Sequence, residues 1–309
     1  MALSGVYSYT RTANQVIQAA LEELLVVGQG ETITGNDYTR AYDSLNRLLK
    51  QIQTDGGHLW TETEGTLFPQ KGQAEYDFST AKLANKWFET KTTANASAGD
   101  TSIEVLSVDN IQAGDNIGII LHTGFVQWTT VASIATLTVN LDDPLESDTL
   151  SGGFVRNYRD SFIPVLRVMN VRRRESDQYE IPIVFESRED YFNLPNKEQQ
   201  GTPIQAYYSR QEPFGKMYLW STPNNADQLI NFTYERKLNI VEDNADDIDI
   251  PDYWVNAFIL NLASMLAPRY GVSPEIKQDI YLRAKETMAE ALSYDNPVYP
   301  ITINMQRYG

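Results

Sequence analysis

The sequence holds few side chains arranged for acid–base or nucleophilic catalysis. Histidine is the most frequent general base near neutral pH, and only His58 and His122 are present. A Ser-His-Asp site would need one of them, yet His58 follows a Gly-Gly pair and His122 lies among short predicted strands, where exposed histidines are ordinary. Cysteine is absent, so thiolate nucleophiles, disulfides and thiolate metal ligands are excluded. We expect no catalytic residue and no enzymatic activity.

Carboxylates are abundant and gather in one run ahead of the last two predicted helices. The run consists of Glu242, Asp243, Asp246, Asp247, Asp249 and Asp252. No register of this run fits an EF-hand calcium loop, and the run lacks the glycine which that loop requires. The preferred interpretation is a solvated connector whose acids favour the N-terminus of the next helix, with weak divalent-cation binding as the alternative. We expect no metal site and no cofactor.

Two other patterns have chemical associations of their own. Gly28-Gln29-Gly30 with Gly35 faintly resembles a dinucleotide fingerprint, but that motif follows a strand and here a strong helix pattern precedes it. We interpret it as a helix–helix connection. The run Arg172–Arg174 is the one basic cluster, and successive residues of a strand point to opposite faces. A salt bridge or solvent exposure is the preferred interpretation, with phosphate contact as the alternative.

The charge balance excludes one class of partner. Forty-one acidic residues against 25 basic ones give a net charge of −16. A protein that wraps nucleic acid needs a basic surface, whereas an acidic surface lets DNA slide past without sticking. Solubility alone is the simpler explanation of the charge. No apolar run reaches eighteen residues, and Met1–Tyr9 lacks the pattern of a secretory signal, so we expect no membrane partner.

Helical periodicity is confined to the two ends of the chain. Apolar residues recur at helical spacing over 12–27 and 35–55, with a capping box at Thr12 and Gln15 and a C-terminal stop at Gly28. Near the other end, 251–267 is apolar nearly all round, and Ser273-Pro274-Glu275 begins a helix that ends near Leu292. We expect one helical bundle from residues 1–58 and 250–292.

The middle of the chain predicts strands, which makes the fold class α+β. We expect a β region over 59–90 and 158–249, with an inserted small β-barrel or sandwich over 91–157. The strands expected in the insertion are 102–108, 116–122, 126–134 and 136–141. Those expected after it are 165–171, 179–185, 204–209, 217–221 and 228–238, with a helical turn over 187–193.

Residues 293–309 follow the last helix and read as an extended arm. The arm contains two prolines, and apolar and polar residues alternate from Ile301 to Met305. Such a segment cannot bury its own apolar side chains, so it either pairs with the chain's own sheet or adds as a strand to a partner. The residues expected to bind are Tyr294, Pro297, Val298, Tyr299, Ile301, Ile303, Met305 and Tyr308.

Three blocks of sequence then carry a resemblance to a known family. They read TANQVIQAALEELLVVGQGETITGNDYTRAYDSLNRLLKQIQTDGGHLW, ESREDYFNLPNKEQQGTPIQAYYSRQ with MYLWSTPNNADQLINFTYERKL, and IPDYWVNAFILNLASMLAPRYGV. In them the chain resembles the head-to-tail adaptors (tail accessory factors) of short-tailed bacteriophages. The resemblance covers most of the chain outside 91–157, and the smallest family members lack that insertion. It rests on the whole pattern, since no short motif within it is diagnostic.

The resemblance implies a structural role in the virion tail, at the head-to-tail interface, after synthesis in the host cytoplasm. A twelve-fold ring would join the portal protein to the tail nozzle protein around the DNA exit channel. Neighbouring subunits would pack through their helices, double-stranded DNA would pass without specific binding, and the arm would reach onto the portal. Burial of about six apolar side chains at ~1.5 kcal/mol or more each would outweigh the cost of ordering the arm.

Two alternatives from other functional classes remain open. One is a carboxylate-based hydrolase of cell-wall glycans, although 41 acids guarantee some close carboxylate pairs in any fold. The other is a host-receptor or carbohydrate-binding tail component, in which Trp128, Tyr158 and Phe125 stack on sugars. Packing in a core is the more ordinary use of such aromatic residues.

Overall fold

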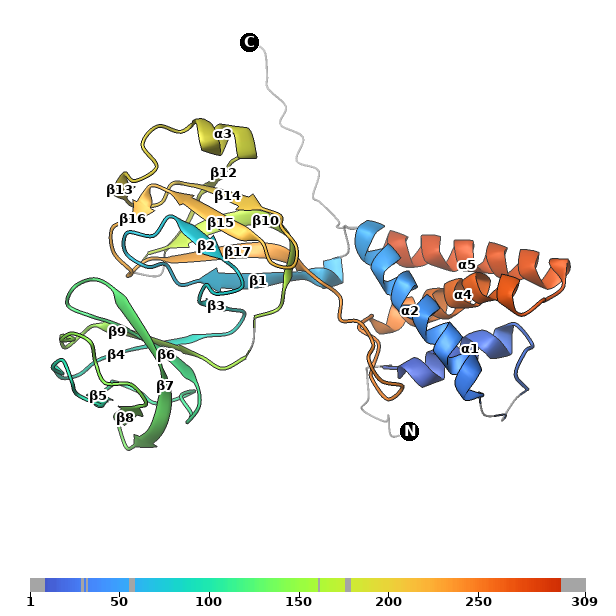
Figure 1. Ribbon diagram of the computed structural model, residues 1–309, viewed down its shortest axis with the longest axis horizontal. Helices are drawn as coiled ribbons and strands as arrows, with labels where there is room; N and C mark the ends of the chain where they lie inside the picture. Colours follow the sequence, from blue (N-terminus) through green and yellow to red (C-terminus); the bar gives the residue numbers. More distant parts are fainter. Residues whose placement is uncertain are drawn as a thin grey trace, which may run out of the picture. The chain divides into compact units, whose positions relative to one another are not determined.

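A computed structural model describes residues 9–28, 31, 33–55, 59–160, 162–175 and 179–295. The fold is α+β, and it divides into two compact units (Figure 1). Both ends of the chain, up to Thr61 and from Lys237 onward, form a helical unit. Residues Glu62–Arg236 form a β unit. Among the helices of the described residues, none is both long and apolar enough to span a bilayer.

The helical unit is centred on α4 (Val255–Leu266), which contacts three other helices. These are α1 (Ala13–Glu23), α2 (Gly35–Asp55) and α5 (Pro274–Tyr294). Three short 3-10 turns complete the unit, η1 (Leu59–Thr61), η2 (Asp252–Trp254) and η3 (Ala267–Arg269). Because α4 is surrounded, it is apolar nearly all round, and Phe258 and Leu262 at its centre are fully buried.

The predicted caps place the starts of two helices correctly. Thr12 and Gln15 form the capping box of α1, and Ser273 caps α5 with Pro274 in its first turn. The predicted end of α1 is wrong, because the helix ends at Glu23 and not near Val27. Leu25, with φ 56°, takes the left-handed conformation that was expected of Gly28.

The segment after Arg236 belongs to the helical unit and not to the β region expected up to residue 249. Leu238, Val241 and Ile248 are buried in the same core as the helices. The backbone of Val241 is held by Asn46 of α2, whose side chain bonds both its N–H and its C=O, at 3.0 and 3.1 Å. Three apolar side chains therefore decide where this acidic segment packs.

Two sheets of the β unit share one core. The five-stranded sheet has the order β11 (Glu180–Pro182), β10 (Val165–Arg174), β17 (Leu229–Arg236), β1 (Glu62–Leu67) and β3 (Leu83–Ala84). The four-stranded sheet has the order β12 (Val184–Phe185), β14 (Gln205–Ser209), β15 (Lys216–Trp220) and β2 (Glu75–Asp77). A short pair joins β13 (Gln200–Gly201) to β16 (Thr222–Pro223). The helix α3 (Arg188–Asn193) lies within the helical turn predicted over 187–193, is capped by Ser187 and lies against β14.

The insertion is a six-stranded sheet whose two edges meet. Its order is β4 (Phe88–Lys91), β9 (Phe154–Tyr158), β6 (Asn116–Ile120), β7 (Val126–Ala135), β8 (Thr138–Leu141) and β5 (Ser102–Glu104). A bridge between Thr92 and Val105 joins the ends of β4 and β5. Its paired strands run from Phe88 to Tyr158, slightly beyond the 91–157 expected.

One glycine of the insertion is fixed by an aromatic neighbour. Gly118 of β6 lies opposite Trp128 of β7 in the strand register. A Cβ at Gly118 would lie 2.7 Å from the indole ring, closer than van der Waals contact allows. The missing side chain thus makes room for Trp128 to lie over the sheet.

Candidate functional site

A groove of about 880 Å³ lies between α1 and α5 of the helical unit. Its apolar lining comes from both helices and from the loop after α1, and consists of Ala19, Leu25, Val27, Ile276 and Ile280. Leu25 is 77% exposed, because its left-handed backbone turns the side chain out of the core.

The groove has an acidic rim. Its carboxylates are Glu22, Glu23, Glu275 and Asp279, against one base, Arg283. The guanidinium of Arg283 lies 2.9 Å from the Glu23 carboxylate across the groove and 3.8 Å from Asp279 one turn earlier on α5. Since Arg283 is engaged by two acids, the rim keeps an excess of negative charge.

The predicted arm begins at the end of α5, where Ser293, Tyr294 and Asp295 are described and Tyr294 is the one predicted binding residue among them. Tyr294 is the last residue of α5 and not part of an extended segment, which corrects the expectation. Its ring lies 4.7 Å from that of Tyr253, whose hydroxyl donates to the Asp295 carboxylate at 3.3 Å. Burial, and then the charge of Asp295, raise the pKa of Tyr253 to about 12.

The other arm residues lie outside the described part of the chain. They are Pro297, Val298, Tyr299, Ile301, Ile303, Met305 and Tyr308. Their role stays a prediction from the sequence.

The acidic run of 242–252 folds into turns beside α1. Asp246 accepts the backbone N–H groups of Asp243 and Glu242, at 2.8 and 2.9 Å, and these bonds lower the pKa of its carboxyl. Asp249 accepts the N–H of Asn239 in the same way. Among the described residues, no three histidine, cysteine, aspartate or glutamate side chains are grouped so as to hold a metal ion. Asp246 and Asp249 therefore hold the turns of this connector through their bonds to backbone N–H groups.

The remaining sequence candidates are dispersed. His122 is exposed after β6, and its backbone N–H donates to the carbonyl of Asp148. His58 and Gly30 lie outside the described residues, while Gly35 is the first residue of α2.

The basic cluster at the end of β10, Arg172–Arg174, makes its contacts within the β unit. Arg172 lies on the outer face of the five-stranded sheet, where it pairs with Glu180 of the neighbouring strand β11 and with Glu64 of β1, two strands away. Arg173 points inward, donates to the carbonyl of Pro203 at 2.7 Å and pairs with Glu175. The guanidinium of Arg174 lies 4.9 Å from the ring centre of Trp87. The predicted alternation of faces is confirmed.

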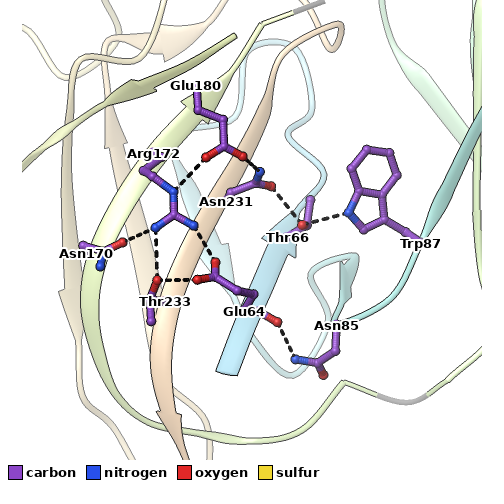
Figure 2. A network of polar contacts seen from close by, with 9 residues as sticks. All are labelled: Glu64, Thr66, Asn85, Trp87, Asn170, Arg172, Glu180, Asn231 and Thr233. Atoms are coloured by element: carbon purple, nitrogen blue, oxygen red, sulfur yellow. Dashed lines mark hydrogen bonds and ion pairs between the residues drawn. The ribbon is translucent and has the colours of Figure 1, made fainter. Parts of the chain in front are cut away.

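Figure 2 shows the polar network around Arg172, which connects β10 with β11, β17 and β1. Its Nη2 and Nε donate to Glu64 of β1 and Glu180 of β11, at 2.5 and 3.0 Å. Its Nη1 donates to Asn170 and to Thr233 of β17. Glu180 also accepts a hydrogen bond from the Asn231 amide, and the Thr233 hydroxyl donates to Glu64. Every charged member of the network therefore has a partner.

Two carboxylates therefore share one guanidinium on an accessible face. The Glu64 side chain is 60% exposed and that of Glu180 is 40% exposed. A close pair of carboxylates is the arrangement that glycoside hydrolysis uses, but here an arginine lies between them. The network extends through Asn231 and Thr66 to the indole N–H of Trp87, which links it to the insertion side of the β unit (Figure 2).

Two of the three aromatic residues considered for sugar stacking pack inside the β unit. Trp128 and Tyr158 lie 5.5 Å apart and both contact Phe68, in a small cluster that also includes Trp87. Phe125 is 45% exposed, with the Lys71 ammonium 5.5 Å from its ring centre. One exposed ring beside a lysine gives a smaller stacking surface than the sequence suggested.

The comparisons with known proteins give little further guidance. No protein-family model and no curated protein matches the chain. Among solved structures, it is similar to the Gp54 tailspike of Acinetobacter baumannii bacteriophage AP22 in complex with A. baumannii capsular saccharide. The identity is 17%, the match covers 25% of this chain and 16% of the tailspike chain, and the TM-score is 0.22. A similarity this low carries no argument about fold or function.

Proposed function

We propose that the protein is a structural head-to-tail adaptor of a phage virion, which forms a ring joining the portal to the tail nozzle around the DNA exit channel. In this proposal α1, α2, α4 and α5 act as a ring-forming helical bundle. The observation that carries it is the union of both chain ends in one helical unit, with the arm following α5 directly. The family resemblance of these same segments and the net charge of −16 support it.

The test removes the arm and leaves the helical unit intact. Deletion of Pro297–Gly309 should abolish binding to the portal in a pull-down or by electron microscopy of the mixture. The thermal melt should stay nearly unchanged, because the deletion lies beyond the buried residues of α5, the last of which are Ala291 and the cap Asp295. A large loss of thermal stability would show that the arm is an internal strand of this protein, and unchanged portal binding would refute its role.

A hydrolase of cell-wall glycans is the second candidate, and Glu64 and Glu180, which both pair with Arg172, are the carboxylates that it would use. The purified protein would then clear a suspension of peptidoglycan, and a Glu64→Gln variant would not. Absence of clearing by the wild-type protein at high concentration would eliminate this candidate.

A further inference from the structure

The exposed face of α2 carries a charge opposite to that of the chain as a whole. Residues at helical spacing form one solvent-exposed stripe along this helix, Asn36, Thr39, Arg40, Asp43, Arg47, Lys50, Gln51 and Thr54. Three of them are basic, and the one acid, Asp43, is paired with Arg47 at 2.8 Å. Arg269 adds a fourth base beside Arg40, since its guanidinium donates to the Arg40 carbonyl at 3.1 Å.

The α1–α5 groove has the complementary character. Its rim holds four carboxylates against the single Arg283, which two of them already engage. The groove floor is apolar, with Ile276 and Ile280 on the α5 side. Lysine and arginine side chains suit such a surface, because their methylene stems lie on apolar groups while their charged ends reach the rim.

We propose that the α2 stripe of one copy docks in the α1–α5 groove of a second copy. The two surfaces belong to the same helical unit but share no residue, so the contact is heterologous and leaves a free groove at one end and a free stripe at the other. Repeated contacts of this kind close into a ring when the rotation between copies permits. The contact deepens the proposed function and rests on it, because it names the surfaces through which neighbouring subunits of the ring meet.

Exposed ion pairs are individually weak and screened by salt, so the contact should be weak in isolation and sensitive to ionic strength. A preformed partner that holds many copies close together would then favour closure of the ring. Duplex DNA is the competing ligand for a basic helical stripe. The acidic groove repels DNA. Reversal of the groove charges should therefore weaken docking of a second copy but should not weaken binding of DNA to the stripe.

The experiment exchanges the charges of the two surfaces. In one variant Glu22→Lys and Asp279→Lys reverse the groove, and in another Arg40→Glu and Lys50→Glu reverse the stripe. Sedimentation velocity at low ionic strength should show self-association of the wild-type chain, weakened at least tenfold in either variant. A one-to-one mixture of the two variants should recover it, because each reversed groove meets a reversed stripe. A chain with all four changes should also associate. Circular dichroism checks that the helices are intact.

A second readout traps the contact covalently. The chain has no cysteine, so Lys50→Cys with Asp279→Cys introduces the only two thiols. Mild oxidation should give a ladder of dimers, trimers and larger species, while proteins with one of the two cysteines should give no ladder. Unchanged self-association in the groove variant alone and in the stripe variant alone would overturn this contact and leave the adaptor proposal standing. A wild-type chain that stays monomeric, together with a double-cysteine variant that gives no ladder, would also overturn it. So would a stripe that binds DNA while reversal of the groove charges leaves self-association unchanged. Portal binding by the arm tests the adaptor proposal separately.

Discussion

The two units of this protein are stabilised in different ways. The core of the helical unit consists of apolar side chains, and its buried polar residues among those described are Ser44, Thr61 and Asp295. Among the described residues, the β unit buries four charged side chains, Asp115, Arg156, Arg173 and Glu235, whereas the helical unit buries one, Asp295 at the end of α5. Each of the four charges in the β unit has an oppositely charged partner or a set of carbonyls around it.

This difference indicates which kinds of substitution should destabilise each unit. Apolar packing is non-directional and tolerates changes that keep volume, because many neighbours share each contact. A buried charge depends on a few directional bonds, and the loss of one partner leaves the other uncompensated. We therefore expect the helical unit to respond to lost volume and the β unit to respond to lost hydrogen bonds. Four predictions test this comparison.

The largest effect is expected at Arg156, which connects the insertion to the loop before β17. Its buried guanidinium pairs with Glu89 at 2.9 Å and donates to the carbonyls of Ala226 and Asp227. Arg156→Met should destabilise the β unit by about 3–5 kcal/mol, because it leaves the Glu89 carboxylate and the two carbonyls without their hydrogen-bond donor. Denaturant unfolding measures the loss, and hydrogen exchange should localise it to β9 and the 225–228 loop. Arg210→Met, at an exposed position, is the control and should change stability by less than ~0.5 kcal/mol.

The matching change in the helical unit is Leu262→Ala. This side chain is fully buried at the centre of α4, so its truncation should cost roughly 3 kcal/mol through lost contacts and a cavity. Leu262→Met keeps the volume and should cost less than ~1.5 kcal/mol. The comparison breaks if methionine at 262 is as damaging as alanine, or if Arg156→Lys is tolerated as well as Leu262→Met.

A smaller effect is expected at Arg172, whose network lies on an accessible face. Arg172→Met removes bonds to Glu64, Glu180 and Thr233 but leaves these groups within reach of water. We expect a loss of about 1–2 kcal/mol, measured by denaturant unfolding. A loss as large as that of Arg156→Met would show that burial is not what separates the two arginines.

The smallest effect is expected at Asp115 in mild acid. Burial opposes its charge, but bonds from Arg159, from the Gln112 N–H and from Asn157 outweigh burial and lower the pKa of Asp115 from its ordinary 3.8. A lowered folded-state pKa stabilises the protein above pH 3.8, and this stabilisation is lost as the pH falls through the lowered value. Melting temperatures between pH 6 and pH 2.5 should therefore fall below pH 3.8, and less steeply in Asp115→Asn. Equal slopes for both proteins would contradict the prediction.

Much of the fold follows from local sequence signals. The capping box at Thr12, the Ser273-Pro274 start and the Ser187 cap all place helices where they occur. Four of the six strands of the insertion, β5 to β8, follow from alternation and turn residues, whereas β4 and β9 were not predicted. Thr136 with Leu137 forms the tight turn between β7 and β8. These features depend on neighbours in sequence, so a single sequence contains them.

Other features depend on distant partners. Leucine rarely adopts a positive φ, so no local signal marks Leu25 as the left-handed residue after α1. The placement of Leu238, Val241 and Ile248 is hidden by the acids around them and is decided by the helices they meet. The groove escapes sequence reasoning for the same reason, because Glu22 and Asp279 are separated by most of the chain.

One feature of the chain path has a mechanical consequence. The chain leaves the helical unit through β1 and returns through β17, which pair as antiparallel neighbours from Glu62–Glu235 to Leu67–Ile230. A tension applied between Thr61 and Lys237 would pull both strands from the same end and separate their hydrogen bonds one pair at a time. The β unit should thus unfold by unzipping from Glu62, at a lower force than a sheet pulled in shear. Tension applied only between helices would not act on the β unit.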